Sequence, residues 1–272
     1  MRAASEMTLT VTTEERRRLA LAATGAELRA DDSGNERFVG LASPFNVRAP
    51  IGNPKTWGFF EEFAPGAYTK TLNEGDQRML IDHDSYYVVS RVSAGTLKLA
   101  QSARGLEVDS RLDEELSYVR DLKANLRNAN ITGMSIGFYV VKDSWSLIEV
   151  EEEGDDGKIR VYEAELRTVH EVRLIEVSAV TFPAFADTEA ELNSVASALA
   201  LRADAGAVER RAAHRPELRD VLQVIAPREP GESTRADETP EPGETTRRHV
   251  EEIDLAMRGL AARFPGLTLP TA

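Results

Sequence analysis

Hydrophobic and polar residues alternate over several stretches of the first 180 positions, and this period of two is typical of β-strands. The clearest case is 96–100 followed by 106–112, separated by a short segment rich in Ser and Gly, which predicts a β-hairpin. Shorter apolar runs predict strands at 37–42 and 78–81, and a long alternating run predicts a strand at 169–181. The first half of the chain is therefore predicted to be mainly β.

A period of three to four residues replaces this alternation in a few places. Leu116, Val119, Leu122 and Leu126 predict a helix, with Asp113 as its N-cap. A second short helix is predicted to run from Pro65 towards Leu72. Between 143 and 160 an acidic run with two glycines predicts a solvated hairpin tip, because it lacks the ligand order of an EF-hand calcium loop.

The chain divides into three parts by composition. Residues 1–35 are charged and irregular, and we interpret them as a variable N-terminal arm, either a frayed helix or a flexible segment. Residues 36–187 carry most of the predicted strands and form the main predicted domain. Residues 188–272 form a tail, with helices predicted at 188–201, at 216–225 and near 250–260, and a flexible Pro- and Glu-rich linker at 227–246.

Composition narrows the classes of function. The chain has 272 residues, of which 42% are hydrophobic and 29% charged, which is enough apolar material for a core. It has no cysteine, so disulfides and thiolate chemistry are excluded, and a reducing compartment is compatible. No stretch is apolar and long enough to predict a membrane span or a secretion signal, so we expect a soluble intracellular protein. A net charge of −13 argues against nucleic-acid binding.

The candidate nucleophile is Ser135, which lies between Gly133 and Gly137 at the start of an apolar run. If this run is a strand, Ser135 and Gly137 share one face, where the missing side chain of glycine would let a substrate backbone approach. Gly-x-Ser-x-Gly is also the pentapeptide of the α/β-hydrolase elbow. The aromatic and β-branched residues that follow Ser135 predict a strand rather than the helix of that elbow. An ordinary strand-end serine is the structural alternative.

A serine nucleophile needs a base and a residue that orients the base. His83 follows the 78–81 strand and is the candidate base, although Asp82 and Asp84 would favour its protonated form unless their side chains point elsewhere. On the long strand, Glu176 and His170 lie on the same face, among apolar neighbours. A buried glutamate needs a partner, and a histidine N–H is a natural one, whereas an edge strand would leave Glu176 in solvent.

Several of these segments occur together in the order found in one known family. They are 62–67, 83–84, the 104–106 hairpin, 133–138 and 174–184. As a set, over about residues 36 to 187, the chain resembles the prohead (capsid maturation) proteases of tailed bacteriophages, which are related to the herpesvirus assemblin serine peptidases. By this resemblance Ser135 corresponds to the nucleophile, His83 to the general base and Glu176 to the acid that orients His83. Assemblins use a second histidine in the third role, so His170 is the alternative.

The resemblance implies a mainly β protein with flanking helices (α+β), with a compact antiparallel β-barrel core followed by the helical tail. It implies a serine endopeptidase that acts in the host cytoplasm, inside the immature capsid. Its substrates would be the major capsid protein and the scaffold, often with self-cleavage, and it would use neither cofactor nor metal. A homo-oligomer remains open. The competing hypothesis is a non-catalytic capsid assembly or scaffolding protein, and metal-dependent hydrolysis is a distant third because four histidines show no ligand spacing.

Overall fold

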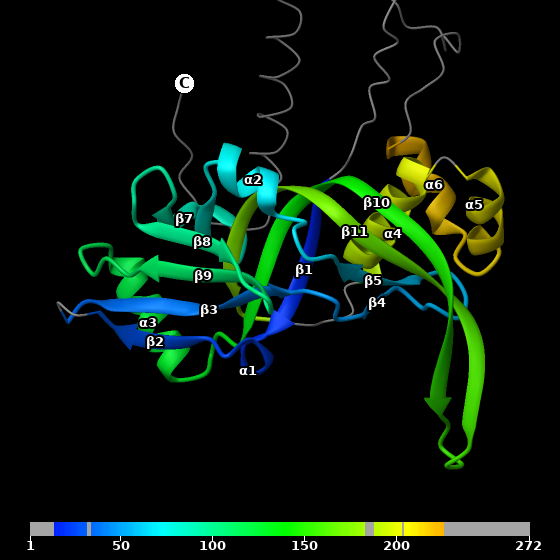
Figure 1. Cartoon of the computed structure of the whole chain (residues 1–272), viewed down its shortest axis with the longest axis horizontal. Helices are drawn as coiled ribbons and strands as arrows, with labels where there is room; N and C mark the ends of the chain where they lie inside the picture. Colours follow the sequence, from blue (N-terminus) through cyan, green and yellow to red (C-terminus); the bar gives the residue numbers. More distant parts are fainter. Residues whose placement is uncertain (1–13, 32–33, 183–187, 203, 226–272) are drawn as a thin grey trace, which may run out of the picture. The chain divides into compact units, whose positions relative to one another are not determined.

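Two long strands form the centre of the larger sheet. β10 (Gly133–Glu153) and β11 (Ile159–Val180) pair antiparallel, and β1 (Glu15–Ala20) pairs antiparallel with the start of β10. β5 (Phe59–Phe63) and β6 (Arg78–Ile81) run parallel to β11 and pair with it at different points along its length (Figure 1). The structure is a computed structural model that describes residues 14–31, 34–182, 188–202 and 204–225.

Two further strands complete the seven-stranded sheet, and four others form a second sheet. β4 (Ala49–Ile51) pairs with β5, and β7 (Asp84–Arg91) pairs with β6. The strands of the smaller sheet, in spatial order, are β2 (Glu27–Ala30), β3 (Glu36–Pro44), β9 (Gly105–Arg111) and β8 (Leu97–Gln101). The predicted hairpin at 96–112 is confirmed as β8 and β9, and the predicted strands at 37–42 and 78–81 are confirmed as β3 and β6.

The α+β class is confirmed, but the predicted antiparallel barrel is not found among the described strands. Their pairing gives two open sheets, and β5 and β6 enter the larger one parallel to β11. A barrel closes only when its two edge strands pair with each other. Here the edge strands β1, β4 and β7 each pair with a single neighbour among the described strands, so the larger sheet stays open.

The described helices lie at the ends and sides of these sheets. They are α1 (Leu21–Thr24), α2 (Thr69–Glu74), α3 (Ser117–Arg127), α4 (Thr188–Arg202), α5 (Ala205–Ala212) and α6 (Glu217–Ile225). Helix α3 begins at Ser117, later than predicted, because the Asp113 carboxylate accepts a hydrogen bond from the Glu115 amide in a turn before the helix. Val119 and Leu122 are buried, as the pattern predicted. The predicted linker and the helix near 250–260 lie outside the described residues. No described helix is both long and apolar enough to cross a membrane.

A buried ionic network fixes β1 in the larger sheet. The Arg167 side chain is fully buried; its Nη1 lies 3.1 Å from both Glu15 and Glu61, and its Nε lies 2.7 Å from Asp143. Arg17 binds Glu61 through its Nε at 2.5 Å. Burial opposes ionisation of Glu61, but the charges of Arg17 and Arg167 outweigh it and hold the pKa of that carboxyl below its usual value. The irregular arm expected at residues 1–35 is therefore wrong for 15–30, where β1, α1 and β2 form and both strands pair into the sheets.

The apolar core lies beneath the other face of the strands that carry the candidate site. Met134, Ile136 and Phe138 of β10 and Val177 and Ala179 of β11 belong to one buried cluster that also takes in side chains of the smaller sheet. The alternate residues of the same strands, among them Ser135 and Glu176, therefore point to the opposite face. Core packing on one face thus positions the polar groups on the other.

Candidate active site

Ser135 lies at the start of β10, between two other strands. It is directly opposite Arg18 of β1 on one side and Ser178 of β11 on the other. The serine is completely buried, with an exposed fraction of 0%. The space beside it differs from the prediction: a Cβ placed on Gly137 would lie only 2.4 Å from Oε1 of Glu176. The glycine therefore makes room for the Glu176 carboxylate and does not open a path for a substrate backbone.

His83 occupies a two-residue turn between β6 and β7. Ile81 and Asp84 pair across the turn, and both residues between them have left-handed backbone angles, with φ of 48° at Asp82 and 63° at His83. This is the geometry of a tight type I′ hairpin, and it is unfavourable for residues other than Gly, Asn and Asp. A non-glycine residue held in such a conformation is often found at a functional site.

The carboxylates that flank His83 both point away from its ring. Asp82 accepts hydrogen bonds from the Thr181 amide at 2.8 Å and the Thr181 hydroxyl at 2.7 Å, which tie the turn to the end of β11. The Asp82 amide also donates to the Ala179 carbonyl at 2.9 Å. Asp84 accepts from the Tyr86 amide at 2.8 Å. From the sequence we expected His83 to serve as a base only if these carboxylates faced elsewhere. Both carboxylates bind other groups.

Glu176 is the carboxylate that contacts His83. Its Oε1 lies 2.6 Å from His83 Nδ1, and the two side chains are only 7% and 4% exposed. Ser178 supports both residues, because its hydroxyl donates to Glu176 Oε2 at 2.5 Å and accepts from the His83 amide at 3.2 Å. A carboxylate bound to Nδ1 favours the tautomer that carries its proton there, which leaves Nε2 available as a base.

The other ring nitrogen of His83 and the hydroxyl of Ser135 are both unpaired. His83 Nε2 and Ser135 Oγ are buried and have no hydrogen-bond partner among the described residues. They do not bond to each other in this conformation, although Ser135 and Ser178 are directly opposite on neighbouring strands and Ser178 bonds to the His83 backbone. Two buried, unsatisfied polar atoms are unfavourable in a purely structural role. Their joint occurrence marks this place as a candidate site.

His170, the alternative third residue, lies elsewhere. It is exposed, and its Nε2 is 2.7 Å from the hydroxyl of Ser144 on β10. Six residues of β11 separate it from Glu176, a distance of about 20 Å along a strand. The structure thus brings Glu176 to His83 and leaves His170 apart from both.

Two supporting residues were not identified from the sequence. Ser178 holds Glu176 and the His83 backbone, and Asp82 holds the turn. A local signal existed for Ser178, since in a strand it shares a face with Glu176 two positions earlier. No local signal linked Asp82 with Thr181, because 99 positions separate them.

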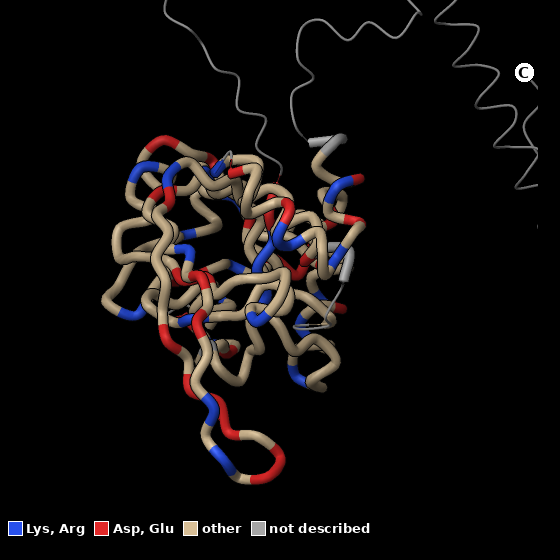
Figure 2. Tube along the Cα trace, turned by 90° about the vertical axis from the view of Figure 1, so that its right-hand side faces the viewer, with Lys and Arg blue, Asp and Glu red and all other residues tan. Residues whose placement is uncertain are grey.

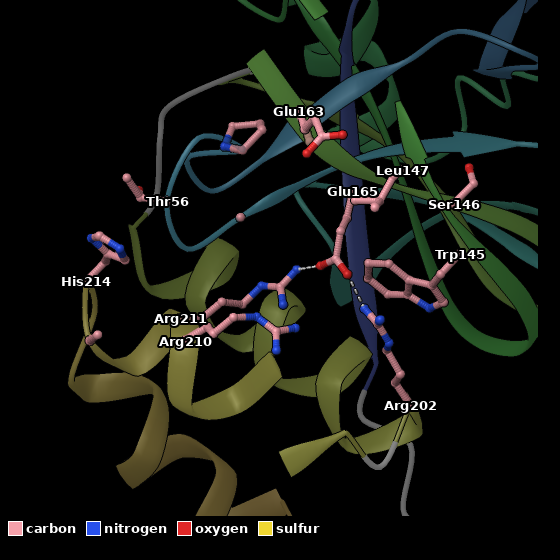
Figure 3. Close-up of a pocket in the computed structure, with 14 residues that line it drawn as sticks. Thr56, Trp145, Ser146, Leu147, Glu163, Glu165, Arg202, Arg210, Arg211 and His214 are labelled. Atoms are coloured by element: carbon pink, nitrogen blue, oxygen red, sulfur yellow. Dashed lines mark hydrogen bonds and ion pairs between the residues drawn. The ribbon is translucent and has the colours of Figure 1, made fainter. Parts of the chain in front are cut away.

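A separate pocket of about 860 Å³ lies between β10, β11 and the helices α4 and α5 (Figure 3). Glu165 stands at its centre and binds Arg202 at 2.6 Å and Arg211. Burial acts to raise the pKa of Glu165, but the hydrogen bonds from these two arginines outweigh it and lower that pKa. Ser135, His83 and Glu176 do not line this pocket, so it is not the cleft of the candidate active site.

The described residues contain no group of three or more His, Asp or Glu side chains arranged to hold a metal ion. The side chains of the candidate site are a hydroxyl, an imidazole and a carboxylate. In an α+β protein, a serine on the same sheet face as a buried carboxylate–imidazole pair has the side chains of a serine hydrolase.

Comparison with known proteins gives the family. Residues 24–200 match the Caudovirus prohead serine protease family, and this chain belongs to that family. It is 29% identical over 150 residues to the prohead protease of Enterobacteria phage HK97. The aligned region covers 54% of this chain and 55% of that protein. The chain thus spans about half the length of this relative. A solved structure of the bacteriophage T4 capsid assembly protease, gp21, aligns with 61% of this chain and 98% of its own, at 15% identity and a TM-score of 0.34.

Proposed function

We propose that this protein is a serine endopeptidase that cleaves the major capsid protein, the scaffold, or both, and often itself, during maturation of a phage prohead. Family membership supports proteolysis in capsid maturation. The observation that carries the residue assignment is the 2.6 Å contact of Glu176 Oε1 with His83 Nδ1, together with the unpaired His83 Nε2. In this proposal Ser135 is the nucleophile, His83 the general base and Glu176 the residue that orients it.

The mechanism is acyl transfer. His83 Nε2 takes the Ser135 proton as the serine oxygen attacks a peptide carbonyl, and Glu176 stabilises the imidazolium that forms. The imidazolium then protonates the leaving amine, and water attacks the acyl-enzyme with His83 again as base. Ser178 acts as a positioning residue, because it keeps the Glu176 carboxylate aligned. Catalytic hydrogen bonds are often long in the free enzyme and form only with substrate, so the missing Ser135–His83 bond is compatible with this mechanism.

The site must open before a peptide reaches it, because Ser135 is completely buried. A buried serine is also what a non-catalytic assembly or scaffolding protein would have. That second function is therefore tested alongside the first. A serine-directed fluorophosphonate separates the two. An enzyme labels at Ser135, and the label disappears in Ser135→Ala, whereas a non-catalytic protein does not react.

The main test is intact-mass analysis of the protein alone and with the major capsid protein encoded near it. Wild type should yield discrete fragments and Ser135→Ala should yield none. Ser144→Ala is the matched control, since Ser144 lies on the same strand but contacts His170, outside the candidate site. Equal behaviour of wild type and Ser135→Ala in every mixture would refute the assignment.

The place of action and the domain bounds are part of the proposal. We place the activity inside the immature capsid within the host cell. The catalytic domain is proposed to span residues 36–187. Strand β1 pairs with β10 and helix α4 packs near β4 and β1 from outside these bounds, so truncations at residues 35 and 187 test how far the folding unit extends.

A further inference from the structure

The ends of β10 and β11 form a two-stranded arm, residues 142–165. Its base lines the pocket beside α4 and α5, and its outer part extends beyond the core. Within the arm the two strands pair only with each other among the described residues, because β1 stops at the partner of Phe138 and β5 begins at the partner of Leu166. Figure 1 shows the arm curving away from both sheets. Both of its edges therefore carry backbone donors and acceptors that a further strand could use.

One face of the arm exposes large aliphatic side chains. Leu147, Ile159 and Val161 are 69%, 66% and 60% exposed, and the strand register places them on the same face. We call this surface the arm face. An isolated two-stranded ribbon is only marginally stable in water, so aliphatic residues exposed along it lose the burial that would stabilise it. These residues indicate a surface that is covered in a complex.

Four further side chains of the arm face are acidic and exposed, and none of the four forms an ion pair among the described residues: Glu149, Glu151, Glu153 and Glu163. Glu165, on the same face at the base of the arm, is already paired with Arg202 and Arg211. Glu149 and Glu163 lie directly opposite each other across the two strands. Like charges in this position destabilise a strand pair. A cationic partner would remove that repulsion, and Figure 2 shows the acidic residues along the arm.

We propose that the arm face binds an extended, basic segment of a partner protein. Every second residue of this segment faces the arm, and these facing residues are by turns aliphatic and Lys or Arg. The segment would add to the open edge of β10, pack its aliphatic residues on Leu147 and Val161, and place its cations beside Glu149 and Glu163. A second copy of the arm is disfavoured as the partner, because it carries the same acidic charge. Nucleic acid is disfavoured for the same reason. About 12 residues of β10 lie between Ser135 and Leu147, roughly 40 Å of strand, so this surface is separate from the candidate active site.

The test is fluorescence anisotropy with the full chain and a labelled peptide, Val-Thr-Lys-Thr repeated three times, at physiological salt. As a strand this peptide places Val and Lys on one face and Thr on the other. Wild type should bind. Glu149→Gln/Glu163→Gln should bind roughly tenfold more weakly, and Leu147→Ser/Val161→Ser roughly fivefold. Glu74→Gln/Glu115→Gln makes the same change in net charge away from the arm and should bind as wild type. Val47→Ser, at an exposed valine elsewhere, is the apolar control.

A peptide of equal charge with proline at two of the threonine positions tests the extended pairing, because proline cannot complete a strand ladder. It should bind clearly more weakly. The inference is overturned if wild type does not bind, if the proline peptide binds equally, or if the control variants lose as much affinity as the arm variants. A dimer that depends on Leu147, detected by light scattering, would also overturn it. Circular dichroism checks folding, and the single variant Glu163→Gln replaces any double variant that fails to fold.

Discussion

Substituting Gly137 by alanine tests the internal geometry of the candidate site. The added Cβ would lie 2.4 Å from Glu176 Oε1, whereas a normal carbon–oxygen contact is at least about 3.4 Å. The carboxylate must therefore retreat by about 1 Å. If it retreats away from His83, the Nδ1–Oε1 distance of 2.6 Å becomes about 3.6 Å, which is too long for a hydrogen bond.

The expected consequence is a loss of activity with a modest loss of stability. A displacement of about 1 Å in a catalytic group typically lowers the rate about 100-fold. Losing a buried hydrogen bond to a charged group should lower the free energy of unfolding by about 1.5–3 kcal/mol. The rate of fluorophosphonate labelling at Ser135 measures the first effect without a known substrate, and urea unfolding measures the second.

Gly206→Ala is the matched control for this substitution. Its added methyl would meet only the end of the Arg210 side chain at 3.3 Å and the Asp204 carboxylate at 3.4 Å, so labelling should proceed as in wild type. If Gly137→Ala were labelled as fast as wild type, the carboxylate would not need the space above this glycine. The role given to Glu176 would then be wrong.

Three further predictions follow from the site and the buried network. Glu176→Gln should lower Ser135 labelling by about 100-fold or more, whereas His170→Gln should leave it unchanged; the reverse result would assign the third role to His170. Asp82→Ala removes the bonds to Thr181 that hold the His83 turn, so Ser135 labelling should slow. The free energy of unfolding should fall by about 1–2 kcal/mol, seen as a lower thermal unfolding temperature. An unchanged labelling rate would show that the turn holds without these bonds. The pKa of Glu61 is lower in the folded chain than its usual value of 4.5, so its stabilising contribution is complete above about pH 4.5 and is lost as the pH falls through the folded value. Urea unfolding between pH 7 and 3 measures this loss, which should be smaller in Glu61→Gln; an identical pH dependence in that variant would contradict the assignment.

Local pattern was sufficient for the elements whose burial follows from a regular period. The hairpin of β8 and β9 and the buried positions of α3 match their alternation and their three- to four-residue spacing. Strand β1 does not show such a pattern, because charged residues occupy its core-facing positions, with Glu15 buried and Arg17 part-buried. Charged residues at core positions conceal a strand from any reading of hydrophobicity, and only the distant partners Glu61 and Arg167 make that strand stable.

By itself the sequence determined the residue types of the candidate site, the strand character around Ser135 and Glu176, and the family resemblance that joined them. The tertiary structure decided which groups meet: Glu176 with His83, His170 with Ser144, and the Gly137 space with a carboxylate. It also decided that the central strands extend as an arm and that the sheets remain open. The physical reason is that alternation along a strand is a local property. Which strands pair, in which direction and in which register, depends on side chains far apart in the chain, such as Glu15 and Arg167, which are 152 positions apart.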